Sequence, residues 1–441
     1  MSDVNGFTNT ASAGCAGAVN SVPEGWTSAE LSEFCDTVGG GTPDRSVEEY
    51  WNGEIPWASP TEITTRHSKY ISKTKESITL KGLEKSSAKL HPPGTVLMTS
   101  RASIGYVAIN TVPIATNQGF QSLRCKKNAL ADYIYQYITW IRPELERMSA
   151  GSTFSEISSS SVKRLRATLP PLPEQQKIAT ILSSVDEVIE ATRAQIYKLK
   201  DLKAGIMQEL LTKGIGHTQF KDSPAGRIPS SWSYDLLESV ATVQTGVAKN
   251  AKAKGDMIEV PYLRVANVQD GYLNLSEIKS ICIDRSRLER FSLRDEDVLV
   301  NEGGDFDKLG RGAIWDNRVS PCVHQNHVFV VRTDKSWLLP KFFNYLSGSQ
   351  HGKKYYLGCA KQTTNLASLN SSQLKAFPVL LPPVDEQAAI CDLLASVDSK
   401  INLSEKKRSA AEALKKALMQ DLLTGKVRVK TKEKEKESAV A

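Results

Sequence analysis

Few residues of this sequence have the types and spacing that catalysis requires. The two imidazoles of "HQNH" (324–327) are close enough in sequence to share a metal ion, but no helix or strand pattern surrounds them. A phosphate-binding loop needs a further glycine upstream of its Gly-Lys pair, and the pairs at 352–353 and 425–426 lack that loop. The glycines at 39–41 do not continue into a Gly-x-Gly-x-x-Gly cofactor loop. We therefore predict that the chain alone has no metal site, no cofactor and no catalytic activity.

A further motif, the Asn/Asp-Pro-Pro-aromatic tetrapeptide of amino-methyltransferases, is absent because both Pro-Pro pairs follow leucine. Those pairs belong instead to an internal repeat. "LPPLPEQQKIATIL" begins at Leu169, "LPPVDEQAAICDLL" begins 212 residues later at Leu381, and the register holds without a gap to Thr212 and Thr424. Such self-similarity is the strongest sign of organisation that a single sequence can give. The matching positions include Glu174/Glu386, Gln175/Gln387, Ile178/Ile390, Val185/Val397, Asp186/Asp398, Leu202/Leu414, Lys203/Lys415, Met207/Met419, Leu210/Leu422 and Leu211/Leu423.

Each repeated segment has the spacing of a long helix. Apolar or small residues recur at alternating intervals of three and four in the first copy, and more weakly in the second, which indicates a heptad seam. A lone helix of this kind is unstable in water, and two like units about a twofold axis pack the same faces together in antiparallel fashion. We therefore predict a helix pair whose interface contains Ile178, Leu182, Val185, Ile189, Ile196, Leu199, Ile390, Leu394, Val397, Ile401, Leu414 and Leu418.

Several apolar residues fall outside this seam. They suit two purposes equally well, either binding helices of another subunit or widening the contact within the chain. These residues are Ile181, Val188, Met207, Leu211, Leu393, Met419 and Leu423.

The segments between the helices also repeat. "SVPEGW" corresponds to "RIPSSW", "GTVLMTS" to "EDVLVNE", and "STFSEISSSSVKRL" to "TNLASLNSSQLKAF", while the residues between these anchors differ. Short β-branched runs broken by Gly, Pro, Asn and Ser, with one helix near the end, predict a mixed α+β domain in each half. The expected divisions are a tail (1–20), a first globular domain (21–168), a long helix (169–216), a linker (217–226), a second globular domain (227–378), a second long helix (379–426) and a basic tail (427–441).

Composition limits the cellular setting. The chain has 441 residues, 40% of them hydrophobic, and no apolar run approaches the roughly 20 residues that a bilayer span requires. Its seven cysteines are an odd number, are scattered and form no Cys-x-x-Cys pair, which favours a reducing, cytoplasmic compartment. The net charge of +7 lies mainly in the two globular segments. That distribution suits a polyanionic partner and an ordinary mixed-charge surface equally well.

The order of motifs resembles a known family. "GGGTPDRSVEEYWNGEIPWASPTEI" (39–63), "GSTFSEIS" (151–158) and then "LPPLPEQQKIATIL" is similar to one target-recognition half of the specificity subunit of type I restriction-modification systems. The order recurs in weaker form in the second half, where "TGVAKNAKAKGDMIEVPYLRV" (245–265) lacks the Gly-Gly-Thr-Pro signature. The resemblance covers approximately residues 21–426, which is nearly the whole chain.

The resemblance implies a DNA-reading scaffold. Each globular domain would bind one half of a split, asymmetric double-stranded DNA target, and the helix pair would fix the spacing between the halves. Two methyltransferase subunits and, in the full complex, two restriction and translocation subunits would assemble around it. S-adenosylmethionine, ATP and magnesium would then belong to the partner subunits.

Candidate DNA contacts are loop residues whose side chains can hydrogen bond base edges or phosphates. In the first domain they are Arg66, Lys69, Arg101, Asn117, Gln118, Ser152 and Thr153. In the second they are Arg264, Asn267, Asn301, Lys308, Arg311, Gln325, Asn326, Lys361 and Gln362. An ordinary turn or surface role is at least as common for any one of these residues, so the prediction concerns the loops more than the individual side chains.

Two other functions remain open from the sequence. One is an interaction scaffold whose globular ends bind proteins and read no DNA. The other is a self-sufficient enzyme joined to a coiled coil, which the missing motifs disfavour.

Overall fold

The computed structural model describes residues 22–149, 156–248, 255–304, 309–359 and 367–430. The chain divides into two compact units, Met1–Ala194 with Glu405–Ala441, and Gln195–Ser404. One division lies within the long helix α6 (Leu172–Lys213) and the other within the long helix α12 (Val384–Leu422). Each unit therefore contains one globular domain and a part of both helices.

The first unit builds its globular domain from two main sheets. A five-stranded sheet has the order β2-β10-β7-β8-β4, a four-stranded sheet has the order β5-β3-β9-β6, and β1 pairs with β11. The elements are β1 (Thr27–Glu30), α1 (Leu31–Phe34), β2 (Cys35–Gly39), β3 (Trp51–Ala58), α2 (Pro60–Thr64), β4 (Tyr70–Ile71), β5 (Glu76–Ile78), α3 (Leu80–Glu84), β6 (Leu90–His91), β7 (Val96–Met98), β8 (Val107–Asn110), β9 (Ile114–Thr116), β10 (Gln121–Cys125), α4 (Ala131–Ser149), α5 (Ser159–Arg164) and β11 (Arg166–Leu169), with a short 3-10 turn at Glu48–Tyr50.

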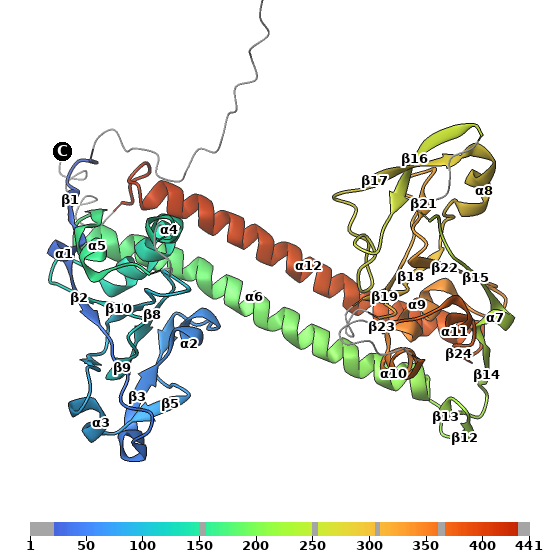
Figure 1. The fold of residues 1–441 in the computed structure, drawn as a ribbon, viewed down its shortest axis with the longest axis horizontal. Coiled ribbons are helices and arrows are strands. Elements are labelled where there is room, and N and C mark those ends of the chain that lie inside the picture. The colour runs from blue at the N-terminus through green and yellow to red at the C-terminus, as the bar shows by residue number, and fades with distance from the viewer. Residues whose placement is uncertain (1–21, 150–155, 249–254, 305–308, 360–366, 431–441) are drawn as a thin grey trace, which may run out of the picture. The chain divides into compact units, whose positions relative to one another are not determined.

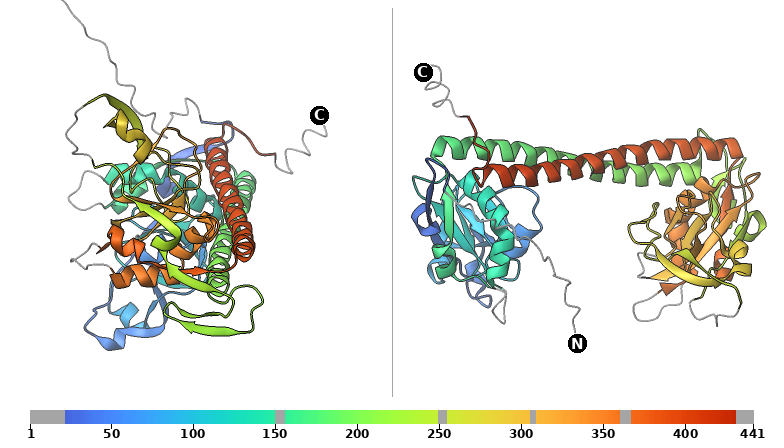
Figure 2. Two further views of the ribbon diagram at one scale, coloured as in Figure 1. Left: turned by 90° about the vertical axis from the view of Figure 1, so that its right-hand side faces the viewer. Right: turned by 90° about the horizontal axis from the view of Figure 1, so that it is seen from above.

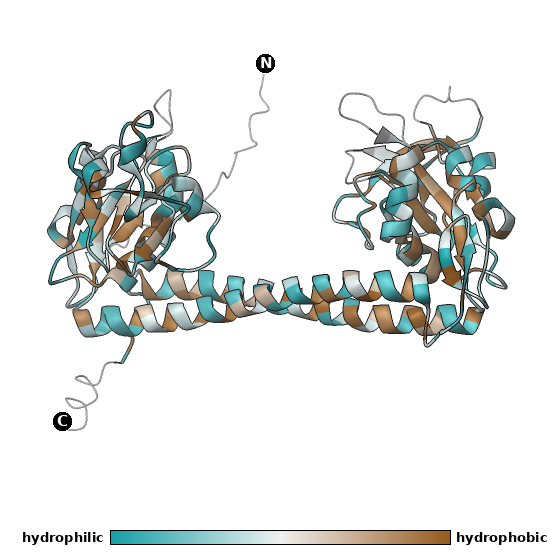
Figure 3. Cartoon of the chain, turned by 90° about the horizontal axis from the view of Figure 1, so that it is seen from below, coloured by the Kyte–Doolittle hydropathy of each residue, from teal (hydrophilic) through white to brown (hydrophobic). Residues whose placement is uncertain are grey.

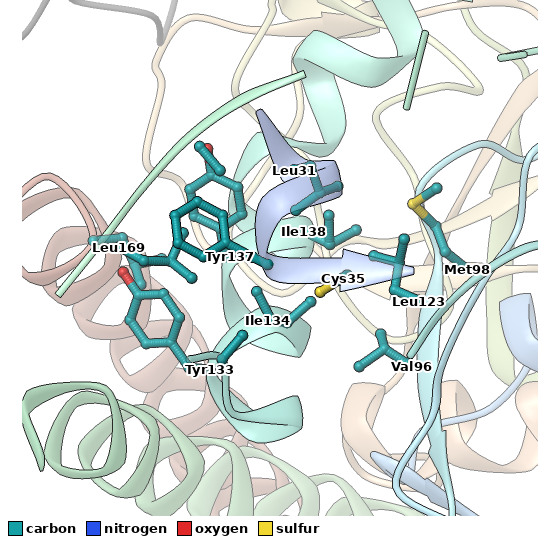
Figure 4. Close-up of a cluster of buried hydrophobic side chains, with 14 of the residues drawn as sticks. Leu31, Cys35, Val96, Met98, Leu123, Tyr133, Ile134, Tyr137, Ile138 and Leu169 are labelled. Atoms are coloured by element: carbon teal, nitrogen blue, oxygen red, sulfur yellow. The ribbon is translucent and has the colours of Figure 1, made fainter. Parts of the chain in front are cut away.

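The core of this domain lies between the five-stranded sheet and α4. Tyr133, Ile134, Tyr137 and Ile138 recur at helical spacing on α4. Figure 4 shows Ile134 and Ile138 beside Cys35 of β2, and the rings of Tyr133 and Tyr137 on the side of Leu169 of β11. On the sheet side, β2 and β10 pair directly at Cys35 and Cys125, whose Sγ atoms are 3.8 Å apart. Burial of this apolar face stabilises the helix on the sheet.

The second unit has the same architecture with different details. Its sheets have the orders β15-β22-β18-β20 and β17-β16-β21, and β14 pairs with β24, β19 with β23 and β12 with β13. The elements are β12 (Phe220–Ser223), β13 (Gly226–Pro229), β14 (Ser233–Leu236), α7 (Leu237–Val240), β15 (Ala241–Gln244), β16 (Met257–Leu263), β17 (Lys279–Asp284), α8 (Leu288–Phe291), β18 (Val298–Asn301), β19 (Gly303–Gly304), β20 (Gly312–Ile314), β21 (Val323–His324), β22 (Val328–Thr333), α9 (Pro340–Gly348), α10 (Gln350–Cys359), β23 (Ala367–Ser368), α11 (Ser371–Lys375) and β24 (Pro378–Leu381), with a 3-10 turn at Arg285–Arg287.

The two units, whose elements are labelled in Figure 1, share several features. In both, a central strand pairs in parallel with one neighbour and antiparallel with the other. In the first unit β3 pairs with β9 and β5 in this way, and in the second unit β16 pairs with β21 and β17. In both, a side chain caps the short helix before the last strand: Ser158 accepts from the backbone of α5, and Asn370 accepts from that of α11. These features confirm the predicted α+β fold with an internal repeat.

Within each unit, α6 and α12 lie side by side in antiparallel fashion (Figure 2). The first unit pairs the start of α6 with the end of α12, and the second unit pairs the end of α6 with the start of α12. Figure 3 shows apolar residues concentrated on the strands inside each globular domain and interleaved with polar ones along the helices. Among the described residues, no helix is both long and apolar enough to cross a membrane.

A glycine with a positive φ follows each helix, Gly214 at +66° directly after α6 and Gly425 at +71° three residues after α12. An added Cβ at Gly214 would lie 2.4 Å from Glu386 Oε1, and one at Gly425 would lie 2.5 Å from Pro23 Cγ. Glycine is therefore needed at both helix ends for its conformation and for its small size.

Candidate nucleic-acid interface

In the first unit, the ends of several strands bring their loops together. The backbone nitrogen of Gly41 donates to Thr116 O at 2.8 Å, Asn117 N donates to Ala58 O at 3.1 Å, Ser100 N to Gly119 O at 2.7 Å, and Ile157 N to Ser100 O at 3.0 Å. We call residues 40–42, 58–60, 99–103, 116–119 and 156–157 the first loop cluster.

Close backbone packing explains the glycines of this cluster. A Cβ at Gly40 would lie 2.0 Å from Asn117 O, and a Cβ at Gly41 would lie 2.3 Å from Ser87 Oγ. Asn117 Oδ1 accepts from Gly119 N at 2.8 Å and shapes its own turn, as asparagine commonly does. The Gly-Gly-Thr-Pro signature thus lets one loop lie directly against another.

The second unit repeats this set of backbone hydrogen bonds. Val247 N donates to His324 O at 2.8 Å, Gln325 N to Leu263 O at 2.8 Å, Glu302 N to His327 O at 3.0 Å, and Leu369 N to Glu302 O at 2.7 Å. A Cβ at Gly246 would lie 2.1 Å from His324 O, so this glycine has the role of Gly40. We call residues 246–247, 263–264, 301–303, 324–327 and 369 the second loop cluster.

The side chains on these two skeletons differ. In the first loop cluster, Arg101 Nε forms an ion pair with Glu156 Oε1 at 2.8 Å, and Thr42 donates to Gln118. In the second, His327 Nδ1 lies 2.6 Å from Glu302 Oε2. Similar backbones therefore present unlike donors and acceptors.

The two histidines of the "HQNH" stretch each have a partner within the chain. His324 is buried and its Nδ1 lies 2.7 Å from Val328 O; burial lowers the pKa of His324 to about 4, so the ring is neutral near pH 7. His327 is exposed beside Glu302. Within the described part of the chain, no group of three or more His, Cys, Asp or Glu residues could hold a metal ion.

Several predicted contact residues lie in the loop clusters. Arg101, Asn117 and Gln118 belong to the first cluster, and Arg264, Gln325 and Asn326 belong to the second. Arg311 is half-buried just before β20. Five candidates fall outside the described residues, namely Ser152, Thr153, Lys308, Lys361 and Gln362.

The predictions for Asn267 and Asn301 are corrected by the structure. Asn267 is 3% exposed, and its side chain binds the backbone of Arg264, Asn274 and Glu277. Asn301 is 2% exposed and donates to Val268 O at 3.0 Å. Both side chains organise turns from inside the domain and present no group to a ligand.

Arg66 and Lys69 lie between α2 and β4 and are not part of the first loop cluster. Lys69 forms an ion pair with Asp132 and donates to Ser183 Oγ on α6 at 3.0 Å, with only 12% of its side chain exposed. Arg66 donates to the carbonyl oxygens of Tyr70 and Lys73. Lys69 therefore fastens the loop to α6, and Arg66 holds the loop together. The sequence did not reveal these structural roles.

The predicted helix-pair residues are mostly enclosed. Buried among them are Ile178, Leu182, Ile189, Ile196, Ile390, Leu394, Val397 and Ile401, and half-buried are Val185, Leu199 and Leu418. Leu414 is the correction, because it is 52% exposed, and its counterpart Leu202 is 53% exposed. A strict heptad drifts around a straight helix by about 20° per repeat, so a distant position turns out of the seam.

The apolar residues outside the seam divide into two groups. Met419 and Leu423 are buried in the core of the first domain, and Leu211 is buried in that of the second, with Met207 packed against it. Ile181 also packs against the first core, whereas Val188 and Leu393 are exposed. The ends of each helix are thus bound by this chain's own domains.

The repeated Glu-Gln pair, whose role the sequence did not reveal, anchors each helix start. Gln175 Oε1 accepts from Leu130 N at 2.9 Å while its Nε2 donates to Pro170 O at 2.8 Å. Gln387 makes the equivalent bonds with Leu339 N at 2.9 Å and Pro382 O at 2.9 Å. Identity at offset 212 was the signal that could have revealed this role.

The glutamates of this pair fasten the end of the opposite helix. Glu174 accepts from the indole of Trp26 at 3.2 Å and from Arg428 Nη2, just beyond α12, at 2.8 Å. Glu386 accepts from the indole of Trp232 at 3.0 Å, and His217 Nε2, just beyond α6, lies 2.8 Å from it. We call these two groups the helix-end contacts.

Comparison with known proteins gives a consistent result. The sequence matches the model of the type I restriction modification DNA specificity domain over residues 23–201 and again over residues 229–413. The type I restriction enzyme MjaIX specificity subunit of Methanocaldococcus jannaschii is 28% identical over 427 residues, 93% of this chain and 95% of the relative. The EcoKI specificity subunit of Escherichia coli is 23% identical over 427 residues, 91% of this chain and 88% of the relative.

Two solved structures share the fold. One, from work on complex assembly and conformational transition of the type I R-M system, has a TM-score of 0.56 at 17% identity and covers 92% of this chain and 100% of that chain. The other is the S subunit of the type I restriction-modification system from M. genitalium. It has a TM-score of 0.55 at 14% identity, and the match covers 92% of this chain and 97% of that chain. Both matches extend over nearly the full length of the chain.

Proposed function

The chain belongs to the family of type I restriction-modification DNA specificity proteins, and from that premise we propose that its two loop clusters bind the two halves of a split, asymmetric DNA target. As a DNA specificity subunit it is a non-catalytic component of its system.

One observation carries the proposal. The same set of backbone hydrogen bonds recurs in both loop clusters, from Gly41 and Asn117 in one and from Val247 and Gln325 in the other. The side chains placed on this common skeleton differ between the two. Two dissimilar sites on one chain suit a DNA target whose halves differ and that needs no palindrome.

Individual contacts follow from the chemistry of base edges. Arginine commonly binds guanine, and asparagine or glutamine commonly binds adenine, in the major groove. We assign Arg101, Asn117 and Gln118 to one half-site, and Gln325, Asn326 and Arg264 to the other. Arg101 would exchange its ion pair with Glu156 for a contact with DNA.

The helix pair supports a role in half-site spacing. α6 and α12 are continuous over 42 and 39 residues. At 1.5 Å per residue each is on the order of 60 Å long. Half-sites read from one side of B-DNA lie about one helical turn, 34–36 Å, apart. In this proposal double-stranded DNA is bound in the cytoplasm within a complex that also contains two methyltransferase subunits and two restriction subunits.

The cofactors are assigned to those partners. S-adenosylmethionine would bind the methyltransferase subunits, and ATP and magnesium would bind the restriction subunits. The sequence fits this division, because the chain has neither a phosphate-binding loop nor an amino-methyltransferase tetrapeptide.

A domain exchange tests the proposal. Residues 21–168 are replaced by the first domain of another family member, and the methylated sites are mapped by methylome sequencing in a host that also carries the partner subunits. We expect one half of the recognised sequence to change while the other half and the spacing stay the same. A change in both halves, or in neither, would contradict the assignment of one half-site to each domain.

Salt dependence separates DNA reading from a protein-binding scaffold. Neutralising several phosphates releases counterions, so binding of a target duplex should weaken by about 10³- to 10⁵-fold between about 50 and 200 mM salt. A protein-protein interface of similar size would change little over the same range. Binding that is insensitive to salt would favour the scaffold.

A further inference from the structure

One carboxylate in each unit joins three separate helices. In the first unit Asp186, on α6, binds Lys415 of α12 through Oδ1 at 2.6 Å. Its Oδ2 accepts from Gln136 Nε2, on α4 of the globular domain, at 2.8 Å. One side chain therefore holds both the partner helix and the domain.

The second unit contains the same arrangement with the helices exchanged. Asp398, on α12, binds Lys203 of α6 through Oδ1 at 2.6 Å. Its Oδ2 accepts from the hydroxyl of Tyr345, on α9, at 2.8 Å. Lys203 also lies 5.3 Å from the centre of the Tyr345 ring. We call each aspartate with its lysine and its domain donor a three-helix junction.

The junctions are partly enclosed. The exposed fractions of the side chains are 23% for Asp186, 16% for Lys415, 32% for Asp398 and 24% for Lys203. Burial, and next the hydrogen bond to Asp398, raise the pKa of Tyr345 well above its usual value, so its hydroxyl stays a donor at every physiological pH. An ion pair so enclosed restrains its helices more than an exposed surface pair does.

The pattern of identity between the repeats is informative. Both aspartates and both lysines match at offset 212, which fixes how the helices pair in each unit. The domain-side donors do not match, since one is an amide on α4 and the other is a phenol on α9. The donor that fixes each domain on the helices thus varies along with the domain.

We propose that Asp186 and Asp398 are positioning residues that fix the orientation of each DNA-reading domain on the helix pair and thereby set which half-site spacing is accepted. This inference rests on the proposed function. A carboxylate suits the task because its two oxygens serve the two partners separately, one for the lysine and one for the domain.

A charged pair near the end of α6 lacks this geometry. Lys213 pairs with Glu209 on the same helix, and both side chains are about 60% exposed. The ion pair joins two turns of one helix. It therefore supplies a matched control on α6.

The experiment uses the full chain in its DNA-binding complex with the partner subunits. Variants are Tyr345→Phe, which removes only the hydroxyl, the exchange Asp398→Lys with Lys203→Asp, and the control Glu209→Gln. Binding is measured on duplexes that contain both half-sites with the native spacer, or with one base pair more or fewer.

We expect Tyr345→Phe to reduce the preference for the native spacer by about three- to tenfold, the value of one hydrogen bond. The charge exchange should restore the ion pair but place its carboxylate on α6, away from the Tyr345 hydroxyl. It should therefore show the same loss of preference. A purely structural ion pair would instead be rescued by the exchange.

The readouts separate this inference from the function on which it rests. If the unaltered complex fails to bind the target specifically, the proposed function fails. If it binds specifically and Tyr345→Phe keeps the native spacer preference, the positioning role is wrong. Hydrogen exchange of the α9 amides gives a readout independent of DNA, and we expect faster exchange in Tyr345→Phe than in Glu209→Gln.

Discussion

At the scale of single residues, the helix-end contact of Glu174 depends on a buried carboxylate. Glu174 is 4% exposed and accepts from Trp26 and from Arg428. Its loss leaves an indole nitrogen and a guanidinium without their acceptor. Because the Arg428 side chain is 30% exposed and can regain water, the cost is smaller than that of a fully buried pair.

We expect Glu174→Ala to lower the free energy of unfolding of the first unit by about 2 to 3 kcal/mol. The measurement is equilibrium urea unfolding followed by tryptophan fluorescence. Glu209→Ala, which removes an exposed pair, should stay within about 0.5 kcal/mol of the parent protein. Equal stability of the two variants would show that the helix-end contact contributes nothing.

Two buried histidines make the free energy of unfolding depend on pH. Burial, and next the Arg124 guanidinium, lower the pKa of His91 to about 4, and burial lowers the pKa of His324 to about 4. An unfolded histidine has a pKa near 6.5, so the unfolded chain binds the proton first. The stability contributed by each neutral ring is complete above pH 6.5 and decreases as the pH falls toward 4.

We expect each histidine to account for a loss of about 3 kcal/mol between pH 7 and pH 4. His91→Gln, which cannot titrate, should weaken the pH dependence of urea unfolding in the first unit and leave that of the second unit unchanged. The same slope in the parent and in the variant would exclude His91 as the source.

The sequence could predict which loops some of the candidate residues share, but not the surroundings of every candidate. Loops rich in Arg, Asn and Gln were recognisable, and Arg101, Asn117 and Gln118 do lie together. Asn267 and Asn301 were indistinguishable from them in sequence, because asparagine satisfies a buried backbone turn as well as it contacts a base. Only the fold determines which of these two environments surrounds the side chain.

At the scale of elements, the repeat predicted both long helices and their starts after Pro-Pro. Its heptad pattern predicted the buried positions from each helix start through the middle, and it failed at Leu414. Near its end, each helix leaves the pairing seam and packs on a globular core, as Leu211 and Leu423 do. The spacing of apolar residues along the sequence does not show that the helix packs on a globular core there instead of on the other helix.

A pair of leucine substitutions tests this account. Leu182 is completely buried, and Leu182→Ala should lower the free energy of unfolding by about 2 to 5 kcal/mol through the lost burial and the cavity it leaves. Leu414→Ala, at a position 52% exposed, should change it by less than about 0.5 kcal/mol. Urea unfolding of the two variants measures the difference, and a large loss at Leu414 would restore the heptad assignment there.

At the scale of the whole molecule, duplication explains why the fold was predictable from one sequence. The two halves share one sequence pattern. A motif that is weak in one half can therefore be recognised from the matching motif in the other half. Pairing of α6 with α12 follows from the symmetry of the repeat rather than from either helix alone. The unlike interiors of the domains carry no such second copy, and their strand order could not be predicted.

Matched insertions test the role of the helices in spacing. One added heptad in both α6 and α12 lengthens each helix by about 10 Å, which corresponds to about three base pairs of DNA. We expect methylome sequencing to show a longer preferred spacer. A heptad added to α6 alone should disrupt the pairing with α12, and an unchanged spacer after matched, well-folded insertions would contradict the proposal.

The opposed thiols of Cys35 and Cys125 have a practical consequence. The bond from Lys126 N to Phe34 O, at 2.8 Å, marks them as a non-hydrogen-bonded antiparallel pair, in which Cα atoms approach to about 4.5 Å. Disulfides span that separation. Oxidation would join the two thiols into a cystine lighter by two hydrogen atoms and link β2 to β10. The hydrogen bond to Cys125 and burial raise the pKa of the Cys35 thiol, so we expect this reaction to need partial opening of the domain. The redox history of a sample then becomes a variable that mass spectrometry can record before any binding measurement is compared.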